Sequence, residues 1–134
     1  MPRRRWLTEI EAALADAYAA AVRLPSAGSL RDGPGFRMSS EEWSRLYEAL
    51  RSVLGESDQY RVLVDPLDGS PVSASVADDF ASIYRALRAG VDALHSGVAP
   101  EELLFEWRLG FEADWGRHAL GALSALRGIV GSEG

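Results

Sequence analysis

Apolar side chains recur every three or four residues in four segments of this 134-residue chain, and this spacing places them on one face of a helix. The first helical segment ends at Pro25, which cannot continue a helix. Its apolar stripe contains Trp6, Ile10, Ala13, Leu14, Ala17, Tyr18, Ala21 and Leu24. The pattern therefore predicts a first helix over residues 6–24.

The second and third helical segments each begin with a capping pattern. Ser39 with Glu42 has the spacing of a capping box, and Gly55 is placed to end that helix. Ser75 with Asp78 offers the same kind of start to the third helix. The predicted inward faces are Trp43, Leu46, Tyr47, Leu50, Val53 and Leu54 for the second helix, and Phe80, Ile83, Tyr84, Leu87, Val91 and Leu94 for the third.

The fourth segment is the longest, from about residue 100 to residue 129. Pro100 followed by two glutamates is typical of a first helical turn. A straight helix of this length would measure roughly 45 Å, which is long for a small domain, so we expect a bend. The glycines at which it could bend, or at which another element could approach closely, are Gly110, Gly116 and Gly121.

Two connections complete the predicted fold. Residues 26–38 are rich in glycine and serine and predict a long loop. Residues 60–64 look extended, but one short strand cannot form a stable sheet, so we expect a crossover segment packed on the helices, with at most a little β pairing. The fold predicted is all-α: four main helices in an antiparallel, bundle-like pack, forming a single domain over residues 1–134.

Composition narrows the class of protein. At 47% hydrophobic and 25% charged, the chain is ordinary for a globular domain. It has no cysteine, which excludes disulfides, thiolate metal sites and cysteine nucleophiles. Glu9, Glu11 and Asp16 interrupt an N-terminus that otherwise resembles a signal peptide. No stretch approaches the roughly 20 apolar residues that span a bilayer, so we expect a cytoplasmic protein with no membrane partner.

The formal net charge is −6, and all fourteen basic residues are arginine. Arginine used to the exclusion of lysine indicates a GC-rich coding sequence, typical of many bacteria. Binding to nucleic acid through its phosphates needs a clustered positive surface, so no nucleic-acid partner is expected. The one cluster of cations, residues 3–5, is predicted to be a solvated tail.

The stretch FEWRLGFEADWGRH, residues 105–118, is unusually aromatic for a helix that also carries charges. His118 falls within its apolar stripe and Arg108 at the margin, with Glu112 one turn beyond Arg108. A buried arginine needs a partner, for which Glu112 or Asp79 of the third helix is suited. The candidate site is therefore Asp79, Tyr84, Trp107, Arg108, Glu112, Trp115 and His118.

Three interpretations of this cluster remain open. It is a polar knot that fixes the register of the third and fourth helices, or a pocket in which Arg108 binds an anion and His118 acts as donor or base. The third is a metal site, since Asp114 and His118 are four residues apart with Glu112 nearby, although the ExxH signature of di-metal bundles is absent. We predict no metal, no cofactor and no catalytic residue, because known nucleophile, phosphate-loop and HExxH motifs are absent as well.

The C-terminal half resembles a known family. The segments DDFASIYRALRAGVDAL and EWRLGFEADWGRHALGALSAL, preceded by YRVLVDPLD, are similar to the bacterial family called domain of unknown function 5063. The resemblance covers about residues 60–126 and implies a small, mostly helical cytoplasmic protein with no established activity. Its shared residues are Asp78, Asp79, Ile83, Tyr84, Leu87, Trp107, Arg108, Phe111, Glu112, Trp115, Gly116, Arg117 and His118.

Two functional hypotheses follow, from different classes. The first is a non-enzymatic interaction or adaptor module that forms a homodimer or binds a protein partner through an exposed apolar face. The second is a small-molecule or anion pocket, with or without a metal, between the third and fourth helices. The second requires Arg108 and His118 to line one cavity together with Asp79 or Tyr84.

Overall fold

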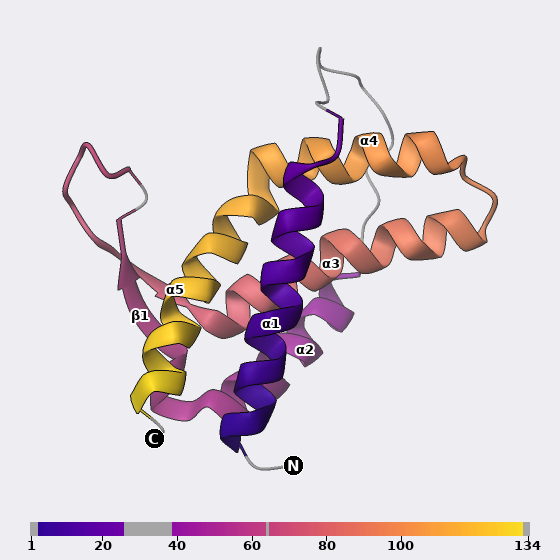
Figure 1. The fold of residues 1–134 in the computed structure, drawn as a ribbon. Helices are drawn as coiled ribbons and strands as arrows, with labels where there is room; N and C mark the ends of the chain where they lie inside the picture. Colours follow the sequence, from indigo (N-terminus) through magenta and orange to yellow (C-terminus); the bar gives the residue numbers. More distant parts are fainter. Residues whose placement is uncertain (1–2, 26–38, 64, 133–134) are drawn as a thin grey trace.

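The computed structural model describes residues 3–25, 39–63 and 65–132 and is mostly helical (Figure 1). The helices are α1 (Arg3–Val22), α2 (Ser40–Leu54), α3 (Val76–His95), α4 (Pro100–Gly110) and α5 (Gly116–Ser132). This confirms the all-α prediction, with the predicted fourth helix divided into α4 and α5. The predicted loop at residues 26–38 lies outside the described residues.

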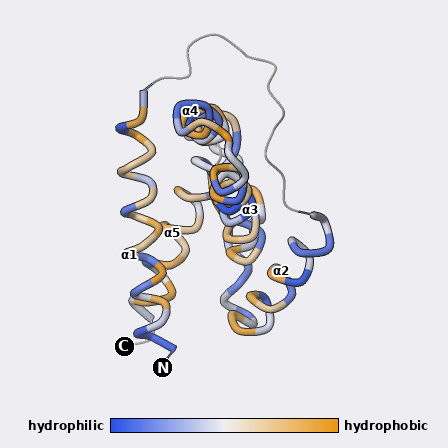
Figure 2. Tube along the Cα trace, turned by 90° about the vertical axis from the view of Figure 1, so that its right-hand side faces the viewer, coloured by the Kyte–Doolittle hydropathy of each residue, from blue (hydrophilic) through white to orange (hydrophobic). Residues whose placement is uncertain are grey.

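Helix α3 is the centre of the fold. It packs against α2, α4 and α5, while α1 packs along α5. Figure 2 shows α3 between α2 on one side and the pair α1 and α5 on the other. The core between them contains Leu7, Leu14 and Ala21 of α1, Leu54 of α2, Val76, Ala77 and Ile83 of α3, Trp115 just before α5, and Ala119, Ala122, Leu126 and Val130 of α5.

Local signals set the helix boundaries as predicted. The backbone N–H of Glu42 donates to the Ser39 side chain at 3.2 Å, and that of Asp78 donates to the Ser75 side chain at 3.1 Å. Gly55 ends α2 with a φ of 56°, a conformation that favours glycine, and Pro100 stands in the first turn of α4. The Ser39 and Ser75 side chains thus satisfy backbone amides that the start of a helix leaves without partners.

The predicted bend is a π-helical turn, η2 (Phe111–Trp115), between α4 and α5. The N–H of Gly116 donates to the carbonyl of Phe111, five residues earlier, and Figure 1 shows α5 leaving α4 at a steep angle. A Cβ on Gly116 would lie 2.5 Å from that carbonyl oxygen, so a side chain does not fit there. Gly110 and Gly116 therefore flank the bend, whereas Gly121 lies beyond it within α5.

The extended segment forms a hairpin. After the short 3₁₀ turn η1 (Gly55–Asp58), β1 (Gln59–Val62) pairs with β2 (Val72–Ser75), in antiparallel register with Tyr60 opposite Ala74 and Val62 opposite Val72. β2 was not predicted, because its sequence VSAS has only a weak apolar alternation. The two strands stabilise each other and pack on helices, which answers the objection to an isolated strand.

Some predicted faces and ends are wrong. Three residues assigned to inward faces are between 37% and 51% exposed, namely Val53, Tyr84 and Leu94. Val53 and Leu94 are near helix ends, where the neighbouring elements no longer cover the stripe.

Residues 3–5 are the first turn of α1 rather than a tail, with Arg3 donating to the Ser57 hydroxyl at 2.9 Å. In the described part of the chain, none of the helices is long and apolar enough to span a membrane.

Candidate functional site

The first turn of α3 is held in place by Asp58, which is only 1% exposed. One carboxylate oxygen of Asp58 accepts the backbone N–H of Ala77, and the other accepts the Ser75 hydroxyl, both at 2.7 Å. A carboxylate in this position accepts hydrogen bonds from amides at the start of the helix, and its negative charge is stabilised by the positive end of the helix dipole. It fixes the adjacent residues Asp78 and Asp79 at the base of the hairpin.

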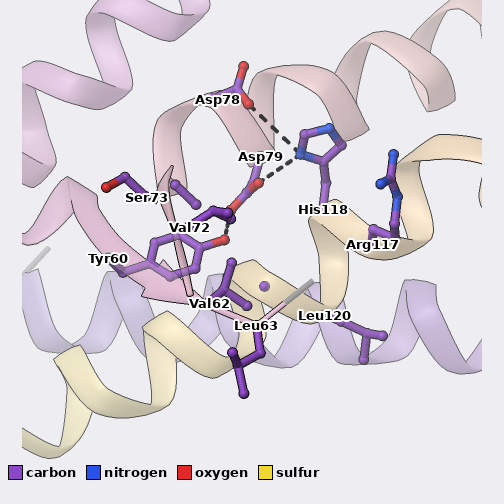
Figure 3. A pocket seen from close by; sticks show the side chains of 12 residues that line it. Tyr60, Val62, Leu63, Val72, Ser73, Asp78, Asp79, Arg117, His118 and Leu120 are labelled. Atoms are coloured by element: carbon purple, nitrogen blue, oxygen red, sulfur yellow. Dashed lines mark hydrogen bonds and ion pairs between the residues drawn. The ribbon is translucent and has the colours of Figure 1, made fainter. Parts of the chain in front are cut away.

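Asp79 joins the hairpin to α5 through what we call the Asp79 network, Tyr60, Asp79 and His118 (Figure 3). The Tyr60 hydroxyl donates to Oδ2 of Asp79, and Nδ1 of His118 lies 2.7 Å from Oδ1. Nδ1 is also 3.9 Å from Oδ2 of Asp78, and Nε2 is 3.5 Å from Oδ1 of Asp114. His118 is therefore surrounded by three carboxylates.

The network shifts the acidity of its members. The hydrogen bond to Asp79 raises the pKa of His118 above its ordinary 6.5, although burial opposes the shift. Burial raises the pKa of the Asp79 carboxyl above 3.8, against hydrogen bonds from His118 and Tyr60 that lower it. Burial and the hydrogen bond to Asp79 raise the pKa of Tyr60, so its hydroxyl stays protonated as a donor.

Gly121 makes room for this network. A Cβ at this position of α5 would collide with the Tyr60 hydroxyl oxygen. The absence of a side chain thus lets the tyrosine reach Asp79 across the face of α5. This is the close approach that the sequence left open as one role of the α5 glycines.

The network lies at one end of a pocket of about 360 Å³, which we call the hairpin pocket. Figure 3 shows its polar side chains converging at one end, with Val62, Leu63 and Leu120 at the other. Leu63, Val72 and Leu120 are between 45% and 52% exposed. The full lining is Tyr60, Val62, Leu63, Val72, Ser73, Ala74, Asp78, Asp79, Arg117, His118, Leu120 and Gly121.

Of the seven predicted site residues, the structure brings only Asp79 and His118 into the hairpin pocket. Arg108 lies elsewhere: its Nε is 2.7 Å from Glu112, and its Nη1 donates to the carbonyls of Ala21 and Val22 at 2.9 Å and of Leu24 at 3.2 Å. Of the two partners proposed for Arg108, Glu112 is correct and Asp79 is not, because Asp79 is occupied by Tyr60 and His118. Arg108 caps the end of α1.

The remaining predicted residues also lie outside the pocket. The indole N–H of Trp107 donates to the carbonyl of Ala86 at 3.3 Å, and that of Trp115 donates to the carbonyl of Trp107 at 3.2 Å. Trp115 is 2% exposed and packs edge-on against Phe111. Tyr84 is 45% exposed. The hairpin pocket is thus lined by His118 but not by Arg108.

Sequence reasoning missed most of the residues that complete the site. Tyr60 was assigned only to an extended segment, and Asp78 only to a helix cap, although both lie in segments that carry the family resemblance. Asp58 and Gly121 carry no local pattern that distinguishes them. The metal interpretation named Asp114 and His118 with Glu112 nearby, whereas among the described residues the ligand atoms of His118, Asp78 and Asp79 lie within 4.8 Å of one another.

A sequence model of the family described as Domain of unknown function (DUF5063) matches residues 1–132. The chain belongs to this family. The match includes α1 and α2, which lie outside residues 60–126, the part of the chain in which the sequence resembles the family. No curated protein matches this chain.

Among solved structures, the crystal structure of protein BF1032 from Bacteroides fragilis is similar, with a TM-score of 0.77 and 21% sequence identity. The likeness covers 96% of this chain and 78% of that chain. At this identity it supports the fold and carries no information about the site.

Proposed function

We propose that this protein is a non-enzymatic binding module and that its ligand enters the hairpin pocket. The observation that carries the proposal is the juxtaposition of half-exposed Leu63, Val72 and Leu120 with the buried Asp79 network. Ligand sites are typically concave, mostly apolar and supplied with a few convergent polar groups. The ligand we infer has an apolar part the size of a side chain and a head that forms hydrogen bonds.

The polar groups around the pocket indicate which kind of ligand head it would accept. The Tyr60 hydroxyl donates a hydrogen bond to Asp79, and Asp79 contacts His118, so the polar groups orient one another. His118 is 24% exposed at its side chain and presents the polar end of the network to the pocket. With His118 protonated, Asp78, Asp79 and Asp114 outweigh His118 and Arg117, which favours a neutral or cationic head over an anionic one.

Three probes that share one ring test this proposal: benzylamine, benzyl alcohol and benzoate, added at millimolar concentration to chelator-treated protein. We expect benzylamine to shift the backbone amide signals of Val72 and Leu120 in ¹H–¹⁵N spectra most strongly, and benzoate least. Leu120→Ser should weaken the response, because it removes apolar contact area from the pocket. Leu120 is 52% exposed, so its replacement should leave the protein folded. Leu94→Ser, on an exposed position of α3 outside the pocket, is the matched control. Unchanged pocket signals with all three probes would contradict the proposal.

A second candidate is a protein interface at the hairpin, including one with a second copy of the chain. It is favoured by Leu67, which is 96% exposed in the turn between β1 and β2, and by Leu63, just after β1, which is 45% exposed. Large apolar side chains left exposed are what a protein interface would cover. We expect self-association, measured by light scattering across a concentration series, to be reduced by Leu67→Ser. A monomer at all concentrations would exclude the homodimer.

A further inference from the structure

We propose that Asp78, Asp79 and His118 form a binding site for a divalent transition-metal cation, of which zinc is the representative, at the polar end of the hairpin pocket. One carboxylate oxygen of each aspartate and a ring nitrogen of His118 lie within 4.8 Å of one another. An imidazole with two carboxylates is a donor set that suits zinc or a similar transition metal, whereas calcium and magnesium prefer oxygen ligands alone.

The spacing of the ligand atoms is close to what a cation needs. Nδ1 of His118 lies 2.7 Å from Oδ1 of Asp79 and 3.9 Å from Oδ2 of Asp78. Bonds of about 2.1 Å in tetrahedral geometry place ligand atoms roughly 3.4 Å apart. Side-chain movements of less than about 1 Å therefore convert the hydrogen-bonded cluster into a coordination shell.

The side chains of Tyr60 and Asp114, which are not ligands themselves, are placed as the outer shell of a metal site would require. Tyr60 donates to Oδ2 of Asp79, which leaves Oδ1 directed at His118 and the proposed cation. The other ring nitrogen of His118, Nε2, is 3.5 Å from a carboxylate oxygen of Asp114. A metal-bound histidine usually donates its second N–H to such a carboxylate, which orients the ring and strengthens it as a ligand.

The site is also rigid and open. Asp58 caps the helix turn that carries the two aspartates, and the π-helical turn ends three residues before His118. Such turns are frequent at functional sites. Three protein ligands leave a tetrahedral ion one position for water or for the head of a bound molecule. The site lies in the pocket of the proposed function, but cation binding does not depend on that function.

Titration of metal ions into untagged, chelator-stripped protein tests the proposal. We expect one equivalent of Zn²⁺ by calorimetry, and Co²⁺ in its place to give visible absorption typical of a four- or five-coordinate ion. Asp78→Asn and His118→Gln should each weaken Zn²⁺ binding at least tenfold, and Asp114→Asn about tenfold through the outer shell. Asp92→Asn, an exposed carboxylate further along α3, is the matched control and should leave the affinity unchanged.

Asp78 is the decisive position because its side chain is 43% exposed and its loss should not unfold the protein. Thermal melts of each variant establish that it is folded. Absence of stoichiometric Zn²⁺ binding would overturn the proposal, as would equal affinity in folded Asp78→Asn and the wild type. Leu120→Ser should weaken binding of the ring probes and leave Zn²⁺ binding intact, so that failure of this site and failure of the proposed function are distinguishable.

Discussion

Asp79 accepts hydrogen bonds on both carboxylate oxygens while only 4% of its surface is exposed. A buried carboxylate without partners would cost several kcal/mol, so Tyr60 and His118 are part of what makes this residue tolerable in the fold. Residues from the hairpin, α3 and α5 thus depend on one another at a single point. Loss of one partner should therefore lower the free energy of unfolding of the whole protein.

We therefore predict that Tyr60→Phe lowers the free energy of unfolding by about 1–2 kcal/mol, because Oδ2 of Asp79 loses its donor while the ring remains. Urea unfolding followed by circular dichroism measures the change. Tyr84→Phe is the matched control: Tyr84 is 45% exposed, and its hydroxyl should contribute less than about 0.5 kcal/mol. Equal effects at the two positions would contradict the role assigned to Tyr60.

At the residue scale, sequence reasoning found several polar side chains of the C-terminal half but not their distant partners. His118 and Asp79 were both candidates, yet their contact spans 39 positions and has no local signature. Arg108 shows the same limit: Glu112, one turn away, was predictable, whereas the α1 carbonyls, more than 80 positions away, were not. Partners at helical spacing follow from geometry, but distant ones follow from the packing of whole elements.

Among the elements, the bend between α4 and α5 decides where Arg108 and His118 face. The π-helical turn inserts one residue relative to an α-helix, which rotates everything after Trp115 about the helix axis. Extending one regular helix through residues 100–129 placed both residues near a common stripe, and the structure separates them. The glycines signalled that a bend exists, but their pattern gave no rotation. Beyond this turn His118 lines the hairpin pocket, whereas Arg108 before it reaches the carbonyls at the end of α1.

Gly116→Ala tests that bend. Its Cβ would lie 2.5 Å from the Phe111 carbonyl oxygen and 3.1 Å from two carbons of the Phe111 ring, and we predict a loss of about 1–3 kcal/mol. Gly128→Ala, in the same helix with nothing within 4 Å of the added carbon, should instead gain about 0.5–1 kcal/mol. The opposite signs in denaturant unfolding separate the bend from general helix propensity. A gain at both positions would show that the turn tolerates a side chain.

Arg108→Met tests the connection between α4 and α1. Three α1-end carbonyls lose a charged donor while most of the apolar contact remains, so we predict a loss of about 2 kcal/mol. Hydrogen exchange should accelerate in the last turn of α1. Arg88→Met removes an exposed pair with Asp92 at helical spacing and should cost under about 0.5 kcal/mol. If Arg108→Met stayed as stable as the wild type yet lost binding of the ring probes, Arg108 would be a ligand residue after all.

On the scale of the whole molecule, the hairpin pocket is formed by β1, β2, α3 and α5, elements whose contacts the sequence pattern does not predict. Helix starts were predictable because Ser39, Ser75 and Pro100 act within one turn of their own positions. The pocket exists only because β2 pairs with β1 and both pack beside α3 and α5, and none of these contacts has a local cause. Fold class is therefore readable from periodicity, while the site is a property of the assembled molecule.

The same assembly makes the stability of the molecule depend on pH. The pKa of His118 is raised in the folded state, so its contribution to stability is complete below its ordinary 6.5 and is lost as the pH rises through the folded value. The raised pKa of Asp79 acts in the same direction at lower pH, since the folded carboxyl binds its proton more tightly than the unfolded one. Both groups therefore favour the folded state more in mild acid than in base.

We predict that the difference in unfolding free energy between wild type and His118→Gln, with a chelator present, is larger at pH 6 than at pH 9. Comparing the two proteins at each pH cancels the charges they share, which matters in a chain of net charge −6. A difference for His118→Gln that is constant, or that grows toward pH 9, would mean that the contact with Asp79 does not favour protonated His118 in solution.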